Sequence, residues 1–155
     1  MKITPIEEVM AGFPLCRDLP PAVVDELRGC ARFRVYRPGQ TLLTEGGAVD
    51  EIFMIRSGSV AIEVDPPGRG PVVIETLGAG EVVGVSWLLP PYRSLFDARA
   101  RAETHTVVLD AVCLRGHCDE DHELGYQLMH QFAGAIRDRL QATRLQLLDV
   151  YGNAR

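Results

Sequence analysis

The run 113–122, CLRGHCDEDH, gathers two cysteines, two histidines and three acidic residues, all of types that can bind a metal ion. Thiolates and imidazoles are the ligands that zinc prefers, and ligands on one face of a helix stand three or four residues apart. Cys113 and Cys118 are five residues apart in this chain. His117 and His122 are also five apart, and there is no Cys-x-x-Cys pair. We therefore expect no metal site, and no disulfide.

Nucleophilic catalysis also lacks its usual patterns. The chain has neither a Gly-x-Ser-x-Gly elbow nor an HExxH motif, and its scattered His and Asp residues form no recognisable pair. The sequence therefore predicts that the protein is not an enzyme.

Composition and charge limit which binding partners and which cellular compartment fit this chain. The formal net charge is −5, so no concentrated positive field favours direct binding to nucleic acid or to a membrane surface. The N-terminus lacks the apolar stretch of a signal peptide, and no run approaches the ~20 apolar residues of a membrane span. We expect a cytoplasmic protein whose four cysteines are reduced thiols.

The pattern of elements predicts a fold. Helical spacing over residues 19–31 is followed, from Phe33 to about residue 111, by roughly eight short alternating segments separated by glycine turns. Two helices follow, over residues 112–118 and from Asp119 to about Val150. The 155 residues form one domain, with a β-roll at about 33–111 and C-terminal helices at about 112–151.

The last helix is too long for a small roll to cover its whole apolar side. Its apolar residues recur at steps of three, four or seven, so the obvious partner is the same helix of a second chain. We expect a homodimer whose interface contains Phe132, Ile136, Leu140 and Leu147.

Three motifs in order resemble the cyclic-nucleotide-binding domain of the cyclic-AMP receptor protein and Fnr-type regulators. They are FRVYRPGQTLLTEG at 33–46, FMIRSGSV at 53–60 and LGAGEVVG at 77–84. The resemblance spans about residues 13–150. It implies an α+β fold: an antiparallel, jelly-roll-like β-roll (a double-stranded β-helix) with an N-terminal helix, a short cassette helix and a long C-terminal dimerisation helix. Full-length regulators continue into a helix-turn-helix domain. We expect this chain to be a stand-alone form without that domain, the alternative being a piece that ends at the domain boundary.

The resemblance also implies a ligand site in the cassette, residues 84–94, GVSWLLPPYRS. In the family, backbone N–H groups of the cassette and an arginine bind the ligand phosphate. Thr143 or Arg144, on the dimer helix, could close over the ligand. The implied ligand-binding residues are Gly84, Val85, Ser86, Arg93, Ser94 and Thr143.

One departure weakens the identification of the ligand. Nucleotide-binding members have a glutamate for the ribose 2′-hydroxyl where this chain has Val85. An unmade charge-assisted bond costs about 1.5–3 kcal/mol, an order of magnitude or more in affinity. Cyclic AMP or cyclic GMP is therefore a candidate ligand, with no other cofactor expected.

Three candidate residues also have a structural alternative. Arg93 could be a surface arginine paired with Asp97. Arg99, a second basic candidate, is better explained by a cross-strand ion pair. Trp87, the only tryptophan, could stack on a planar ligand but fits the core better.

The sequence thus predicts a small-molecule sensor domain that binds a cyclic nucleotide or related anion and signals through a dimer helix. Another regulatory protein is a further candidate partner. The alternative is a ligand-free dimerisation or protein-interaction module with a degenerate pocket.

Overall fold

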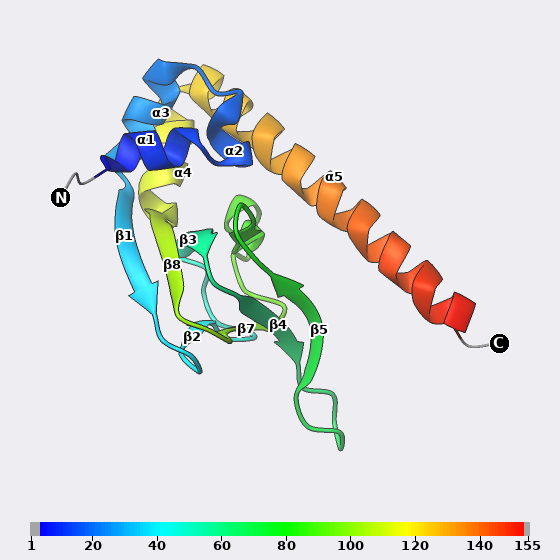
Figure 1. Cartoon of the computed structure of the whole chain (residues 1–155). Coiled ribbons are helices and arrows are strands. Elements are labelled where there is room, and N and C mark those ends of the chain that lie inside the picture. The colour runs from blue at the N-terminus through cyan, green and yellow to red at the C-terminus, as the bar shows by residue number, and fades with distance from the viewer. Residues whose placement is uncertain (1–3, 154–155) are drawn as a thin grey trace.

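The computed structural model describes residues 4–153, in which two four-stranded antiparallel sheets face each other below a layer of helices (Figure 1). One sheet has the order β1-β8-β3-β6 and the other β2-β7-β4-β5. The strands are β1 (Ala31–Tyr36), β2 (Thr41–Leu43), β3 (Glu51–Ser57), β4 (Val60–Val64), β5 (Val72–Leu77), β6 (Val82–Val83), β7 (Asp97–Ala100) and β8 (Thr104–Asp110). This is the predicted α+β fold built on a β-roll.

The core lies between the two sheets. Central strands β3 and β4 carry runs of buried residues, and β8 pairs with both β1 and β3 along its length. Tyr36 packs edge-on against Phe53 with ring centroids 5.9 Å apart. Because the residues of both faces are buried over most of β3 and β4, these strands read as apolar runs rather than strict alternation.

The N-terminal region differs from the prediction of one helix. Three short helices precede the roll: α1 (Ile6–Ala11), α2 (Pro14–Arg17) and α3 (Pro21–Arg28). Only α3 corresponds to the predicted segment. The first two have six and four residues, too few to show a helical period in the sequence.

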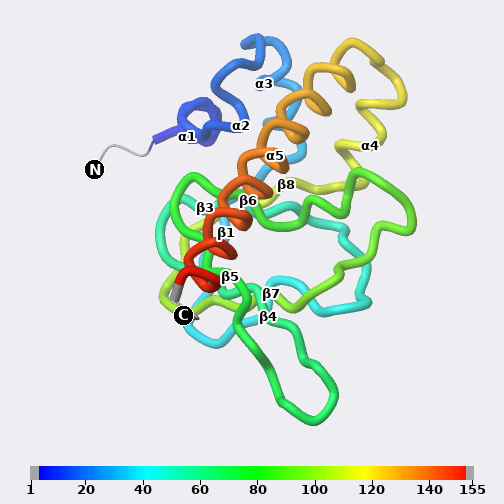
Figure 2. The backbone as a smooth tube through the Cα atoms, turned by 90° about the vertical axis from the view of Figure 1, so that its right-hand side faces the viewer, coloured from blue at the N-terminus to red at the C-terminus, as the bar shows by residue number. Residues whose placement is uncertain are grey.

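Two helices follow the roll: α4 (Ala111–Glu120) and α5 (His122–Asn153). Asp110 caps α4 through its side chain, which accepts from the backbone N–H of Cys113 at 3.0 Å. Helix α5 begins in the helical layer, and its C-terminal half extends away from the strands (Figures 1 and 2). Its length, 32 residues, agrees with the prediction of a long terminal helix.

Phe132 requires a correction. It was predicted at a dimer interface, but it is fully buried within the chain, with its ring 5.1 Å from that of Trp87. Trp87 itself is buried, which confirms its predicted place in the core. The steps of three and four in the sequence could not separate the part of α5 covered by the chain's own cassette from the part left open.

No helix among residues 4–153 is both long and apolar enough to cross a membrane.

Candidate functional site

The cassette loop, residues 84–94, begins at a glycine that the geometry requires. Gly84 has a φ of +104°, and a Cβ there would lie 3.0 Å from the carbonyl oxygen of Glu51. L-residues with a side chain rarely adopt this backbone conformation. One turn of 3₁₀ helix, η1 (Val85–Leu88), follows it. The predicted cassette helix is therefore present as a single tight turn.

Arg93 and Ser94 both donate hydrogen bonds to backbone carbonyl groups. Arg93 is exposed, and its Nη1 donates to the carbonyl oxygen of Gly46 at 2.8 Å. Ser94 is buried, and its Oγ donates to the carbonyl oxygen of Phe96 at 2.7 Å. Both side chains thus fasten the end of the cassette to neighbouring backbone, and Arg93 is held by Gly46 rather than by Asp97.

Arg99 makes the ion pair expected of it. Its Nε lies 3.6 Å from Oε2 of Glu63, a buried carboxylate on the adjacent strand β4. Arg101 reaches the other oxygen of the same carboxylate at 3.8 Å. The two arginines compensate the charge that Glu63 brings into the roll.

A cavity of about 460 Å³ lies between the roll and α5. Its walls come from α2, the β5–β6 connection, the first residue of η1 and the middle of α5. Val85 and Thr143, two of the predicted ligand residues, line it, whereas Gly84, Ser86, Arg93 and Ser94 are not among its lining residues. The volume is within the range of small-molecule sites, about 300–1,000 Å³.

The cavity contains one basic side chain among its described lining residues, Arg139. Its Nη2 donates to the carbonyl oxygen of Val82 at 3.1 Å, and its Nε lies 3.8 Å from Oε1 of Glu75. Glu81 and Asp138 also line the cavity. The local charge is therefore negative, and an anion entering here has to compete with Glu75 for the guanidinium group.

Sequence reasoning missed Arg139 and Glu75. Arg139 stands one helical turn before Thr143, whose Oγ1 donates to the Arg139 carbonyl oxygen at 2.9 Å. That spacing was a usable signal. Glu75, by contrast, lies on β5 and meets α5 only through the tertiary fold.

The expectation of four reduced cysteines is wrong for two of them. Cys30 and Cys113 form a disulfide, with their Cα atoms 5.8 Å apart and a separation of 83 residues in sequence. Strand pairing brings them together, because Ala31 lies opposite Leu109 and the Asp110 N–H donates to the Cys30 carbonyl oxygen at 2.9 Å. Cys16 and Cys118 are free thiols.

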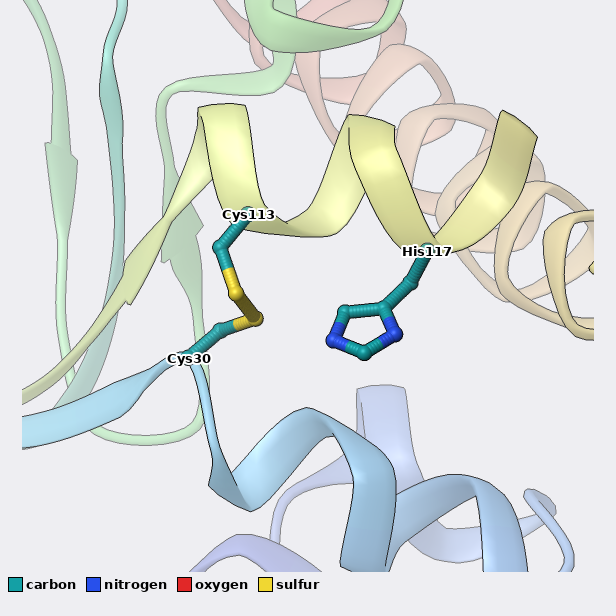
Figure 3. A group of neighbouring side chains, drawn as sticks. All are labelled: Cys30, Cys113 and His117. Atoms are coloured by element: carbon teal, nitrogen blue, oxygen red, sulfur yellow. A yellow bond between two sulfur atoms is a disulfide. The ribbon is translucent and has the colours of Figure 1, made fainter. Parts of the chain in front are cut away.

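His117 joins this pair. Cys30, Cys113 and His117 each offer a metal-ligand atom, and the three atoms lie within 4.8 Å of one another (Figure 3). Cys113 and His117 are four residues apart on α4 and so share a face. Spacings between two cysteines or between two histidines do not reveal this pair, because its members are of different types.

The C-terminal half of α5 exposes a series of large apolar side chains. Ile136, Leu140 and Leu147, three of the four predicted interface residues, are 41%, 50% and 53% exposed. Leu148, Val150 and Tyr151 are also exposed. Such a series is typical of a surface that contacts a partner.

Comparison with known proteins gives one family and one fold. A family model described as "Cyclic nucleotide-binding domain" matches residues 33–121. The chain is similar to a solved putative cyclic nucleotide-binding protein from Geobacter metallireducens, with a TM-score of 0.78, 22% identity and coverage of 90% of this chain and 99% of that one.

Two further structures show the same fold. A cyclic nucleotide-binding domain from Methylobacillus flagellatus has a TM-score of 0.81 and 20% identity, covering 93% of this chain and 83% of that one. The catabolite activator protein of Thermus thermophilus has a TM-score of 0.68 and 22% identity, covering 89% of this chain and 63% of that one.

Proposed function

The chain belongs to the cyclic nucleotide-binding domain family, and on that premise we propose that it is a sensor domain that binds a small molecule between the roll and α5. The cavity there is the single observation that carries the proposal, because one wall belongs to the roll and the other to the exposed helix. A ligand that contacts both walls can change how α5 sits against the roll, and such a differential contact is what signalling requires.

The proposed ligand is a cyclic nucleotide or a related small anion. Arg139 is proposed to bind its charged group after release from Glu75, and Thr143 to donate or accept one hydrogen bond. Val85 offers only an apolar contact at this cavity. Arg93 and Ser94 remain a predicted anion site. Their present hydrogen bonds to backbone carbonyl groups would have to break before either side chain could bind an anion.

The test is a titration with cyclic AMP and cyclic GMP, followed by Trp87 fluorescence and by thermal stability. Trp87 is a suitable reporter because it lies on η1 beside Val85 and packs on α5 through Phe132. We expect saturable changes in both signals. No response to either nucleotide at millimolar concentration would contradict the ligand class proposed here.

Paired variants locate the anion-binding group. Arg139→Ala is expected to weaken binding by roughly ten- to hundredfold, the value of a lost charge-assisted bond. Arg137→Ala is the control for loss of one positive charge on the same helix, since Arg137 pairs with Asp138 and is not among the described residues that line the cavity. If Arg93→Ala instead weakened binding by that amount and Arg139→Ala did not weaken it, the anion site would lie at the end of the cassette.

The output is proposed to pass through a homodimer formed by α5. Ile136, Leu140 and Thr143 line the cavity on the same stretch of helix that exposes apolar side chains. Binding and dimerisation thus share one element. In this role the protein acts in the cytoplasm, without catalysis and without direct contact to nucleic acid or membrane, and another regulatory protein can read the dimer.

A second function is favoured by the charges of the cavity. Arg139 is already paired, two further carboxylates line the same walls, and Arg93 is engaged by Gly46. A ligand-free dimerisation or interaction module would have these properties. A dimer in solution that responds to no cyclic nucleotide would support this second function over the first.

A further inference from the structure

A group of soft metal ligands lies apart from the cavity, where the N-terminal helices meet α4. Cys30 lies between α3 and β1, and Cys113 and His117 lie on successive turns of α4. Figure 3 shows the imidazole of His117 beside the two sulfur atoms. The three candidate ligand atoms lie within 4.8 Å of one another.

The fold positions all three before any metal arrives. The pairing of β1 with β8 places Cys30 next to the start of α4, and the Asp110 cap holds the first turn that carries Cys113. His117 follows four residues later, so its side chain projects from the same face of α4. Each ligand therefore sits on backbone that strand pairing or a helix already orders, which lowers the cost of assembling the site.

A fourth donor stands at the edge of the group. Oε2 of Glu26, on α3, lies 3.8 Å from Nδ1 of His117. The Glu26 side chain is 46% exposed and can turn toward the sulfur atoms, while that of His117 is 34% exposed. Two thiolates, an imidazole and a carboxylate form a tetrahedral donor set suited to zinc.

The distances are compatible with both an oxidised and a metal-bound state. With Zn–S bonds of about 2.3 Å and tetrahedral angles, the sulfur atoms of two thiolates bound to one zinc ion are roughly 3.8 Å apart. The Cα atoms of Cys30 and Cys113 are 5.8 Å apart, so rotation of the two side chains suffices to separate the sulfur atoms. The disulfide joins only the two cysteines, whereas a metal ion would engage the imidazole as well.

We propose that Cys30, Cys113 and His117 bind one Zn²⁺ when the two cysteines are reduced, with Glu26 as the fourth ligand, and that the disulfide is the metal-free oxidised form. An external dithiol supplies two electrons and two protons to the disulfide and itself becomes a disulfide. The two Cys thiols then lose their protons as they bind Zn²⁺. Oxidation of the thiolates by a second disulfide compound reverses the step and releases the metal.

The site would fasten the N-terminal helices to α4, the helix that leads directly into α5. The same two segments are joined covalently in the oxidised form and by the metal in the reduced form. The site is separate from the ligand cavity, so its test is independent of the sensor function proposed above.

The experiment is metal binding to the reduced full chain. The protein is reduced with a phosphine, desalted without oxygen and titrated with Zn²⁺, and the bound metal is measured by elemental analysis. Co²⁺ is used in parallel, because thiolate-to-cobalt charge transfer and strong d–d bands report tetrahedral sulfur coordination. We expect about one metal ion per chain in the wild type.

The variants assign the ligands. Cys30→Ser and Cys113→Ser are expected to abolish the thiolate band, and His117→Ala to weaken binding by at least about a hundredfold. His117→Ala keeps both cysteines, so formation of its disulfide under oxidising conditions shows that the fold is intact. Glu26→Gln is expected to lose about ten- to hundredfold.

Cys118→Ser is the matched control. Cys118 follows His117 directly but lines a separate cavity with Trp87, so this variant should bind Zn²⁺ as the wild type does. Wild-type protein with both thiols reduced that binds no stoichiometric Zn²⁺ would overturn the proposal. So would a His117→Ala variant that binds Zn²⁺ as tightly as the wild type.

Discussion

Gly58 and Gly39 separate two costs of a side chain at positive φ. Gly58 has a φ of +106°, and a Cβ there would lie 2.6 Å from the carbonyl oxygen of Glu103. Gly39 has a φ of +90°, but a Cβ there would meet nothing within 4 Å. The first position combines strain with a clash against backbone, and the second has strain alone.

We predict that Gly39→Ala lowers the free energy of unfolding by about 1–2 kcal/mol, the cost of a left-handed conformation. Gly58→Ala should cost roughly 1–3 kcal/mol more, because the backbone around Thr104 has to move. Urea denaturation of both variants checks the difference. Equal losses of stability in the two variants would mean that the turn between β3 and β4 relaxes around the methyl group added at Gly58.

Thiol reactivity is the second prediction at this scale. Burial raises the pKa of Cys16 to about 11 from the ordinary 9.0. Burial, and then the charge of Asp119, raise the pKa of Cys118 as well, although this residue is only partly buried. Below the ordinary pKa of 9.0, a thiol whose pKa is raised to about 11 has about a hundredfold less thiolate, so at pH 8 iodoacetamide should modify Cys118 well before Cys16.

Peptide mapping after timed alkylation of the unreduced protein measures the order. The raised pKa of Cys16 also makes the stability of the folded chain depend on pH. The native state holds the Cys16 proton more tightly than the unfolded chain does, so this contribution is complete below pH 9 and is lost as the pH rises toward 11. Faster labelling of Cys16 than of Cys118 would contradict the burial of Cys16.

At the scale of the element, α5 has two parts with different partners. Leu124, Leu128 and Phe132 are buried by the chain itself, whereas Leu140, Leu147 and Leu148 are exposed. The first part belongs to the core. The second part exposes its apolar side chains, which is typical of a surface that contacts a partner, here the proposed second chain.

We predict that replacing Leu140 and Leu147 with Glu abolishes the dimer, because buried carboxylates without partners oppose association. Gln141→Glu combined with Gln146→Glu is the control, since the pair adds the same two charges about 100° around the helix from Leu140 and Leu147. Light scattering after size exclusion measures the mass. An unchanged mass for the Leu variant would refute this interface.

The cassette is the element where local and distant contacts meet. Gly84 and η1 form from neighbouring residues, but the direction of Arg93 depends on Gly46, which lies 47 positions earlier. The cassette motif predicted the turn correctly. It did not predict that its arginine would donate to another loop.

At the scale of the whole molecule, the Cys30–Cys113 disulfide closes most of the chain into one loop. We predict that reduction in the presence of a chelator lowers the free energy of unfolding by about 2–4 kcal/mol, since the reduced unfolded chain gains conformational freedom. Denaturation midpoints with and without a phosphine reductant measure the loss. Cys118→Ser should behave as the wild type does in both conditions.

Zinc provides a second arm of this experiment. Metal that binds only the folded reduced chain stabilises it in proportion to the logarithm of its concentration. Added Zn²⁺ should therefore restore much of the stability lost on reduction. Identical midpoints for the oxidised and reduced, chelated protein would show that the disulfide contributes nothing to stability.

The sequence alone determined those features whose conformation depends on residues close together in the chain. Glycine turns and short apolar segments predicted the strands of the roll, and apolar periodicity predicted α5, because backbone preference and side-chain period act over a few residues. The place of Trp87 in the core and the ion pair of Arg99 followed from the same local reasoning. The helices α1 and α2 escaped it because they are too short to display a period.

Only the tertiary structure decided which distant side chains meet. The Arg139–Glu75 pair, the bond from Arg93 to Gly46 and the group of Cys30, Cys113 and His117 all join segments far apart in sequence. Such contacts depend on strand register and helix packing, and a shift of one residue would point each side chain elsewhere. Residue types and spacing set the chemistry available to this protein, and the pairing of β1 with β8 and the path of α5 decided where it is assembled.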